Sequence, residues 1–188
     1  EAGEMQLFIQ PNDMEVIIED SMDSAYAFME KIEGKAERVA LTTDVEEDLP
    51  KIPMDARRIR QVITNLLSNA IKFTHDGEVK LTVKAQETGI YVAVHDSGIG
   101  IPQDELGKLF EAFERTTQAK EQNIEGTGLG LPISQYLIQQ HGGSLDVEST
   151  PNEGTIFMFT LPYQRAESDD VTADDTSLMH ILDSGQDQ

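Results

Sequence analysis

The sequence predicts a two-layer α+β sandwich, in which antiparallel strands form a sheet and helices cover one of its faces. Two observations support this fold class. Stretches with helical periodicity are separated by short stretches that alternate between apolar and polar residues, and these come in adjacent pairs joined by turns. The chain of 188 residues, 38% of them hydrophobic, is long enough for one compact domain with its own core.

Charge and composition limit the function classes. The net charge of −21 disfavours nucleic acid and anionic lipid as partners, because both would be repelled. The chain has no cysteine, which excludes disulfides and thiolate metal sites. No apolar stretch approaches the roughly 18 residues of a membrane span, and no signal-peptide pattern opens the sequence. We therefore expect a cytoplasmic protein.

The first helix is expected from Met14 to Lys31, with Asp13 as its N-cap and Gly34 as its stop. Residues 1–12 show no clear period, and Val39–Thr43 is a strand candidate. The pairs Leu49-Pro50 and Ile52-Pro53 are expected to break regular structure. The apolar residues assigned to the buried face of this helix are Val16, Ile17, Met22, Ala25, Tyr26, Met29 and Ile32.

The second helix is expected to follow Asp55 and to run through Lys72. Asp76-Gly77 then predicts a turn, after which Val79–Ala85 and Tyr91–His95 alternate like two paired strands. The helix has a continuous apolar face, formed by Ile59, Val62, Ile63, Leu66, Leu67, Ala70 and Ile71.

The C-terminal half predicts a helix at Leu131–Gln140, ended by Gly142, and strands at Ser144–Glu148 and Thr155–Leu161. Glu105–Phe113 is expected to hold a short helix. Residues 114–127 are polar and unpatterned, which predicts a mobile loop. The tail, 165–188, carries seven acidic residues against one arginine, a net charge of −6, and is expected to be disordered.

The stretch EGTGLGLPIS places Gly126, Gly128 and Gly130 directly before the helix expected at Leu131. It is not a Walker loop, because Leu131 and Pro132 stand where that motif has Lys and Ser or Thr. It is not a dinucleotide fingerprint, because a polar loop precedes it in place of a strand. Free amides at a helix N-terminus favour an anion. Phosphate binding and a flexible surface loop both stay open.

A second glycine motif, DSGIGI, spans Asp96–Ile101 and closes a predicted strand. An Asp at this position can accept a hydrogen bond from an exocyclic amine such as that of adenine. The glycines let a flat base approach the backbone, and Ile99 and Ile101 can form apolar walls. The alternative interpretation is an ordinary Asp-Gly turn.

The helix segment NLLSNAIKFT, Asn65–Thr74, carries polar residues on one stripe. Asn65, Asn69 and Lys72 lie at i, i+4 and i+7 and therefore share a helix face. Two amide oxygens and one cation suit a magnesium ion that carries phosphates, because Mg²⁺ keeps most of its waters and takes one or two protein oxygens. The alternative is a solvated polar face.

Taken in chain order, NLLSNAIKFT, DSGIGI, FEAF at Phe110–Phe113 and GTGLGL resemble the N box, the first glycine box, the F box and the second glycine box of two-component sensor histidine kinases. The resemblance covers about Asp13–Gln164. It implies the Bergerat ATP-binding fold, a mixed and mostly antiparallel sheet with helices on one face. DNA gyrase, the heat-shock chaperone ATPase and mismatch-repair ATPases share this fold. It also implies ATP and Mg²⁺ as cofactors.

The resemblance implies a role for each matching residue. Asn69 is expected to bind Mg²⁺, with Asn65 as its supporting neighbour and Lys72 as a phosphate contact, and these three are the expected catalytic residues. Asp96 is expected to bind the adenine amine, and Phe110 and Phe113 to anchor the lid, residues 114–127. The other expected nucleotide-binding residues are Gly98, Gly100, Ile101, Phe113, Arg115, Gly126, Thr127, Gly128, Leu129, Gly130 and Thr155.

The resemblance implies a protein histidine kinase in a phosphorelay. Its hydrolysing relatives carry a Glu four residues before the metal-binding Asn, where this chain has Asn65, which cannot take a proton. Transfer of the γ-phosphoryl group is therefore favoured over hydrolysis. His95 is expected to be structural, because its side chain points away from the strand face that carries Asp96. None of the four histidines lies in a helix before Asp13: His75, His95, His141 and His180.

The acceptor histidine is therefore expected on a dimerisation domain outside this chain. Residues 1–12 would follow that domain, 13–164 form the catalytic domain and 165–188 an acidic tail or linker. The expected partners are the dimerisation domain and a response-regulator receiver domain, with no nucleic acid and no direct membrane contact from this chain. The full-length protein could be membrane-anchored through an upstream segment. The alternatives are another ATPase or an anti-sigma-type kinase of this fold, and a non-catalytic nucleotide-sensing module.

Overall fold

The computed structural model describes residues 6–121, 124 and 126–164. Their main feature is a five-stranded sheet with strand order β2-β4-β5-β7-β6. The pairing of β2 with β4 is parallel, and the other three pairings are antiparallel. The strands are β2 (Val39–Val45), β4 (Gly77–Ala85), β5 (Gly89–Asp96), β6 (Leu145–Thr150) and β7 (Gly154–Pro162).

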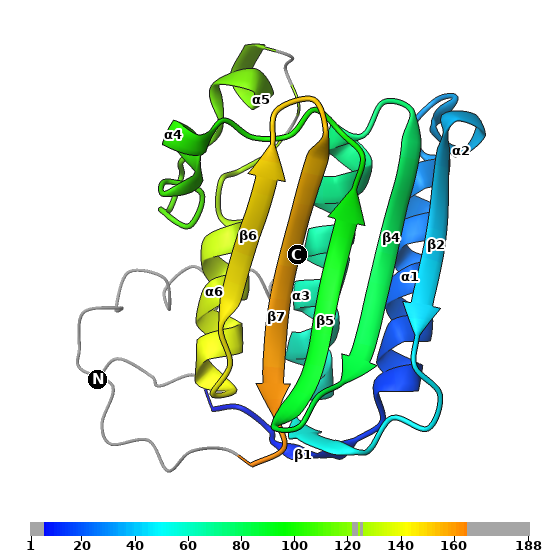
Figure 1. Cartoon of the computed structure of the whole chain (residues 1–188), viewed down its shortest axis with the longest axis vertical. Helices are drawn as coiled ribbons and strands as arrows, with labels where there is room; N and C mark the ends of the chain where they lie inside the picture. Colours follow the sequence, from blue (N-terminus) through cyan, green and yellow to red (C-terminus); the bar gives the residue numbers. More distant parts are fainter. Residues whose placement is uncertain (1–5, 122–123, 125, 165–188) are drawn as a thin grey trace.

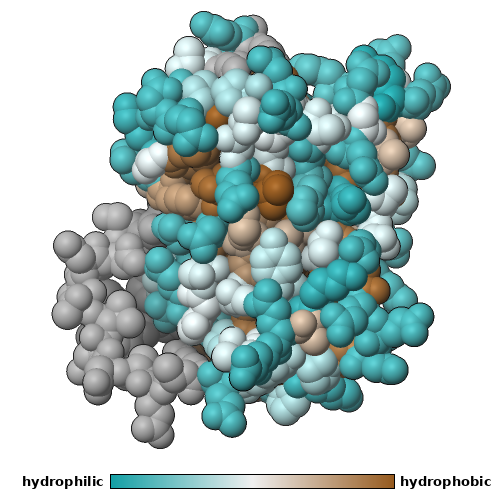
Figure 2. Space-filling model, in the orientation of Figure 1, coloured by the Kyte–Doolittle hydropathy of each residue, from teal (hydrophilic) through white to brown (hydrophobic). Residues whose placement is uncertain are grey.

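Three helices cover one face of this sheet, α1 (Met14–Glu30), α3 (Ala56–Phe73) and α6 (Gly130–Gln140) (Figure 1). The opposite face is coated mainly by hydrophilic side chains, with apolar ones gathered towards the end of the sheet nearest α4 (Gln103–Leu106) and α5 (Thr117–Glu121) (Figure 2). The predicted two-layer α+β sandwich with a mixed, mostly antiparallel sheet is confirmed. The five strands of this sheet and these three helices begin and end within two residues of their predicted bounds.

The helix α3 is the centre of the helical layer, because it contacts α1, α6 and β5. Asp55 begins it by accepting a hydrogen bond from the Arg58 amide at 3.2 Å. All seven residues predicted for its apolar face are buried. No helix in the described part of the chain is both long and apolar enough to span a bilayer.

Two residues predicted for the buried face of α1 are exposed instead. Val16 is 58% exposed and Tyr26 is 45% exposed. The buried stripe includes Met14, Ile18 and Ser21, from which Val16 lies on the far side at 100° per residue. The stripe is therefore narrower and differently centred than the sequence pattern suggested.

A small two-stranded sheet, β1 (Gln10–Asn12) with β3 (Ile52–Met54), contradicts two sequence expectations. Residues 1–12 showed no period, and Ile52-Pro53 was expected to break regular structure. Pro11 lies opposite Pro53 in the register. Since neither proline has an amide proton, they suit a position without ladder hydrogen bonds, where they do not interrupt the pairing.

Three short helices complete the described chain, α2 (Lys35–Arg38), α4 (Gln103–Leu106) and α5 (Thr117–Glu121). The helix expected in 105–113 is shorter and starts earlier, as α4. The loop expected at 114–127 contains α5, which its polar sequence did not indicate. The tail, 165–188, lies outside the described residues, and the domain boundaries at 13 and 164 remain predictions.

A buried histidine joins the start of α3 to the end of α6. The Nε2 atom of His141, at the end of α6, accepts a hydrogen bond from the Asp55 amide at 3.0 Å. Its Nδ1 atom lies 2.7 Å from the Leu137 carbonyl oxygen, so Nδ1 carries the proton. The Asp55 carboxylate also accepts from the Phe8 amide at 3.0 Å. The incoming chain, the start of α3 and the end of α6 thus meet here.

Replacing His141 by Leu should lower the free energy of unfolding by about 2 kcal/mol, because it leaves the buried Asp55 amide without its acceptor. Urea denaturation measures the change. Gln139→Ala, at an exposed position of the same helix, is the control and should have little effect. Equal stability of the two variants would contradict this role of His141.

Candidate functional site

A cavity of about 190 Å³ lies between the C-terminal half of α3, the loop after β5 and the segment before α6. In Figure 1 this is the end of the sheet that carries α4 and α5. The cavity brings together most of the predicted site residues, which are distant in sequence. In its wall are Asn65, Asn69, Lys72, Asp96, Gly100, Ile101, Arg115, Gly126, Thr127, Gly128, Gly130 and Thr155.

Three predicted site residues, Gly98, Phe113 and Leu129, are not in the wall. The Gly98 amide donates to Asp96 Oδ1 at 2.9 Å, so this glycine acts on the site through its backbone. The Phe113 side chain is 66% exposed, and only its main chain anchors the segment, by an amide hydrogen bond to Gly128 O at 3.0 Å. Phe110, by contrast, packs against the core.

The sequence reasoning missed several wall residues, while Ile99 was expected and is present. Phe73 and Ala70 flank the Asn69 turn of α3, and Phe157 follows Thr155 on the same strand face, so helix and strand periods could have found them. No sequence signal indicated those from the polar segment. The missed residues are Ala70, Phe73, Leu109, Glu114, Thr116, Ala119, Ile124, Leu131, Pro132 and Phe157.

Asp96 is the buried charged group of this cavity. Burial raises the pKa of its carboxyl to about 6, and hydrogen bonds from the backbone amides of Gly98 and Thr155 offset part of the rise. At neutral pH the group is mostly an ionised carboxylate, which can only accept hydrogen bonds. The part of the cavity wall around Asp96, which we call the floor, therefore suits a ligand that presents a hydrogen-bond donor.

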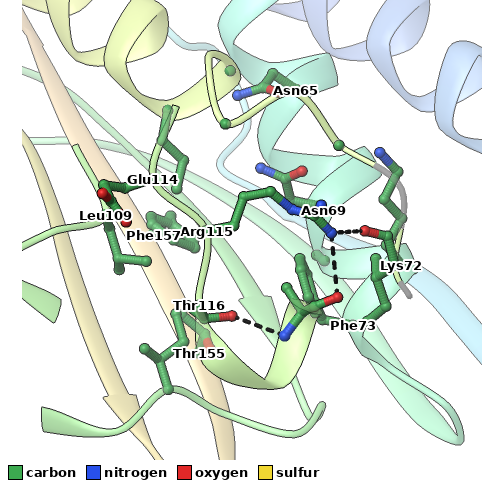
Figure 3. Close-up of a pocket in the computed structure, with 18 of the residues that line it drawn as sticks. Asn65, Asn69, Lys72, Phe73, Leu109, Glu114, Arg115, Thr116, Thr155 and Phe157 are labelled. Carbon is green, nitrogen blue, oxygen red and sulfur yellow. Dashed lines mark hydrogen bonds between the residues drawn. The ribbon is translucent and has the colours of Figure 1, made fainter. Parts of the chain in front are cut away.

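Two residues of the polar stripe of α3 have different surroundings, since Asn65 contacts α6 and Asn69 faces the cavity. Asn65 Nδ2 donates to Ser134 Oγ of α6 at 3.0 Å, and a Cβ atom at Gly130 would lie 2.3 Å from Asn65 Oδ1. Asn65 therefore holds the start of α6 close to α3. One turn further on, the Asn69 side chain makes no hydrogen bond within the described part of the chain and lies free to bind a ligand at the cavity wall (Figure 3).

The start of α6 adds an anion-binding element. Leu129 precedes the helix, and no side chain caps it. Gly130 and Leu131, the first helical residues, line the cavity. Uncapped amides and the helix dipole favour negative charge here. Lys72, on the facing helix, lies with its Nζ atom 5.7 Å from the centre of the Phe28 ring.

Arg115 folds the described part of the segment before α6 over the cavity. Its guanidinium donates to the Ala119 carbonyl oxygen at 3.2 Å and also to the Ile124 carbonyl oxygen (Figure 3). The Ala119 amide in turn donates to Thr116 Oγ1 at 3.2 Å. Ala119 is buried, and both Ala119 and Ile124 line the cavity. Arg115 thus closes the C-terminal end of α5.

Among the described residues, no three His, Asp or Glu side chains are grouped to hold a metal ion. A divalent cation in this cavity would therefore draw on amide oxygens, ligand oxygens and water, which is the donor set that Mg²⁺ accepts. The histidines of the described chain do not line the cavity. His95 pairs with Lys80 and Ile156 in the sheet register, and His180 lies outside the described residues.

Comparison with known proteins gives one family match, to the model described as histidine kinase-, DNA gyrase B- and HSP90-like ATPase, over residues 54–165. The chain is 38% identical to the non-motile and phage-resistance protein of Caulobacter vibrioides over 89% of its length. It is also 38% identical to the sensor histidine kinase WalK of Bacillus subtilis over 63% of its length. It spans about a fifth of each of these two relatives, 20% in both cases.

Solved structures agree in fold. Full-length ShkA in complex with AMPPNP matches with a TM-score of 0.71 and 30% identity, over 88% of this chain and 33% of ShkA. The catalytic domain of the histidine kinase ThkA matches with a TM-score of 0.66 and 28% identity, over 85% of this chain and 99% of that domain. The similarity thus extends over nearly all of a catalytic domain.

Replacing Asp96 by Asn should stabilise the ligand-free protein at pH 7. Because the pKa is raised, the native form binds a proton more tightly than the unfolded chain does between about pH 4 and pH 6. Native stability is therefore lost as the pH rises through this window, by about 2–3 kcal/mol at pH 7. The advantage of the variant should vanish below about pH 4.

Urea denaturation of both proteins across this pH range measures the difference. Asp146→Asn, at an exposed position of β6, is the control and should show no such dependence. A difference between Asp96→Asn and the unchanged protein that is constant with pH would refute the electrostatic explanation.

Replacing Arg115 by Ala should loosen the segment that covers the cavity, because the carbonyl groups of Ala119 and Ile124 lose their donor. Limited proteolysis without ligand should cut this segment several-fold faster than in the unchanged protein. Lys108→Ala, at an exposed nearby position, is the control. Cleavage at the same rate in all three proteins would show that Arg115 does not hold the segment.

Proposed function

Because the chain belongs to the family of histidine kinase-, DNA gyrase B- and HSP90-like ATPases, we propose that it binds ATP with Mg²⁺ and transfers the γ-phosphoryl group to a histidine outside this chain. Its fold is that of histidine kinase catalytic domains. The observation that carries the proposal is one cavity with an acceptor carboxylate at one end and amide, cationic and helix-terminal groups at the other.

The adenine end is the floor around Asp96. The carboxylate accepts a hydrogen bond from the exocyclic amine, and the raised pKa reflects the desolvated environment that strengthens this bond. Ile99, Ile101 and the backbone at Gly100 supply flat apolar contact with the base. A Cβ atom at Gly100 would lie 2.0 Å from the Thr150 carbonyl oxygen, so only glycine fits this loop.

The phosphate end is the space between α3 and the start of α6. The uncapped amides at Gly130 and Leu131 bind phosphate oxygens, together with Lys72 from α3. Asn69 holds Mg²⁺ through its amide oxygen. When bound, the ion neutralises the charge that develops on the phosphates during transfer. Arg115 lines the same cavity and would add a phosphate contact once its guanidinium leaves the carbonyl groups of Ala119 and Ile124.

The chain positions the triphosphate and leaves the γ-phosphoryl group for an external nucleophile. Asn65 stands where the ATP-hydrolysing relatives have a glutamate that activates water. Its side-chain amide donates a hydrogen bond to Ser134. An amide cannot take a proton from water, so hydrolysis lacks its base. The reaction is the breaking of the bond between the γ-phosphorus and the bridging oxygen as the histidine nitrogen attacks in line.

The partners follow from the relatives, two of which are named as a sensor histidine kinase and a signal transduction histidine-protein kinase. The acceptor histidine would lie on a dimerisation domain of the same protein, and the phosphoryl group would pass to a response-regulator receiver domain. Residues 1–12 would connect to the dimerisation domain.

The test is to mix the chain with radiolabelled ATP, Mg²⁺ and separate histidine-bearing dimerisation domains from matching kinases. Acid-labile phosphohistidine on that domain is the expected product. Binding of ATP without phosphohistidine on any matching domain would contradict the transfer. Steady ATP turnover by the chain alone would favour an ATPase, and labelled serine an anti-sigma-type kinase. Absence of ATP binding would favour a non-catalytic module.

Replacing Asn69 by Ala should reduce phosphohistidine formation by about 100-fold or more, because the metal and the γ-phosphate lose their positioning. ATP binding should also lose its dependence on Mg²⁺, which calorimetry in the presence and absence of the ion measures. Gln61→Ala, at an exposed position of the same helix, is the control. Unchanged Mg²⁺ dependence in Asn69→Ala would remove Asn69 from the metal site.

A further inference from the structure

Ser149, at the end of β6, is a buried hydroxyl that the predicted site did not include. It is 8% exposed and lies beside the floor of the cavity. Its Oγ atom has three neighbours at hydrogen-bonding distance: the Ile101 amide at 2.8 Å, the Gly154 carbonyl oxygen at 2.9 Å and Thr155 Oγ1 at 3.0 Å. These three contacts use the full capacity of a hydroxyl group, which has one proton and two lone pairs.

The chemistry of two of these neighbours fixes the direction of the third bond. The Ile101 amide can only donate, and the Gly154 carbonyl can only accept, so the single proton of Ser149 goes to Gly154. The bond between the two hydroxyls must then run from Thr155 to Ser149. The Thr155 proton is therefore directed away from any ligand.

Thr155 is left as a pure acceptor next to another acceptor. It lines the cavity (Figure 3), and it lies directly opposite Asp96 in the register of β5 and β7. Its backbone amide donates to the Asp96 carboxylate. Two neighbouring acceptors attract an amine on the base and repel a carbonyl oxygen at the same position, since a buried acceptor facing an acceptor leaves both unpaired.

We infer that Ser149 is a specificity-determining residue, which orients the Thr155 hydroxyl as an acceptor and thereby makes the cavity select a 6-amino purine over a 6-oxo purine. This inference rests on the proposed function. Ser149 does not touch the base and acts through Thr155, so it is a positioning residue. The Ser149 carbonyl oxygen accepts from Gln103 Nε2 at 2.9 Å, which holds this strand end in place.

The test compares binding of ATP and inosine triphosphate, which carries an oxygen in place of the 6-amino group, by calorimetry with Mg²⁺. In Ser149→Ala the Thr155 proton is released and can turn to the 6-oxo group. The dissociation constant of inosine triphosphate divided by that of ATP should fall by about 5- to 10-fold relative to the unchanged protein. Ser149→Cys, which keeps the side-chain shape with a weaker acceptor, should lower the ratio in the same direction.

A background with Thr155→Val separates orientation from packing. With no hydroxyl at 155, adding Ser149→Ala should leave the ratio unchanged. A Ser149→Ala variant that weakens both nucleotides equally, or a ratio that still changes in the Thr155→Val background, would overturn the inference. Thermal unfolding checks that each variant is folded. If Ser149→Ala does not fold, the comparison is made with Ser149→Cys.

Failure of the proposed function gives a different result. An unchanged protein that binds neither nucleotide would refute ATP binding itself. An unchanged protein that binds ATP, with a ratio insensitive to position 149, would leave ATP binding intact and refute only the role of Ser149.

Discussion

The close packing of three backbone segments around Asp96 is the constraint on which the rest of the site depends. The Ile99 amide donates to the Phe73 carbonyl oxygen at 3.2 Å, and the Ile99 carbonyl accepts from the Asn152 amide at 2.8 Å. The loop after β5 is thereby fixed between the end of α3 and the turn that joins β6 to β7. Because these bonds are made by the main chain, the cavity floor is rigid before any ligand arrives, which lowers the entropic cost of binding.

The burial of Asp96 in this rigid floor lowers the stability of the ligand-free protein. Asp96 is desolvated, and two backbone amides compensate only part of the loss. By the same argument, desolvation would strengthen a hydrogen bond from a ligand amine to this carboxylate. The ligand-free protein thus has a less stable group at the position where we propose that the base binds, a balance common at binding sites. Ser149 extends the arrangement by turning the Thr155 hydroxyl into a second acceptor beside Asp96.

The phosphate end is built on different principles. The helices α3 and α6 are held together at two places, by Asn65 in the middle of α3 with Ser134 and by Asp55 before α3 with His141. Two rigid helices therefore define the width of the cavity, while the described residues of the segment anchored at Phe113 and Gly128 complete its wall. A fixed cradle suits the proposed phosphoryl transfer, which depends on positioning. Since Asp55 also accepts from Phe8, the chain that enters from upstream is tied to the same frame.

The sequence alone predicted the fold class, the main helices and strands and most of the cavity wall. It did so because helix and strand periods are local properties, and because Asn65, Asp96 and Gly130 stand in motifs with a stated chemistry. The pairing of β1 with β3 and the exposure of Val16 were decided by tertiary contacts, which no local pattern encodes. The contact of Arg115 with Ala119 spans only four residues, but no pattern in the polar segment indicated it. The direction of the Thr155 hydroxyl is the clearest case. Ser149 and Gly154 on the β6–β7 hairpin and Ile101 in the loop after β5 set it only when these two segments meet, because a hydroxyl takes its orientation from its neighbours in space.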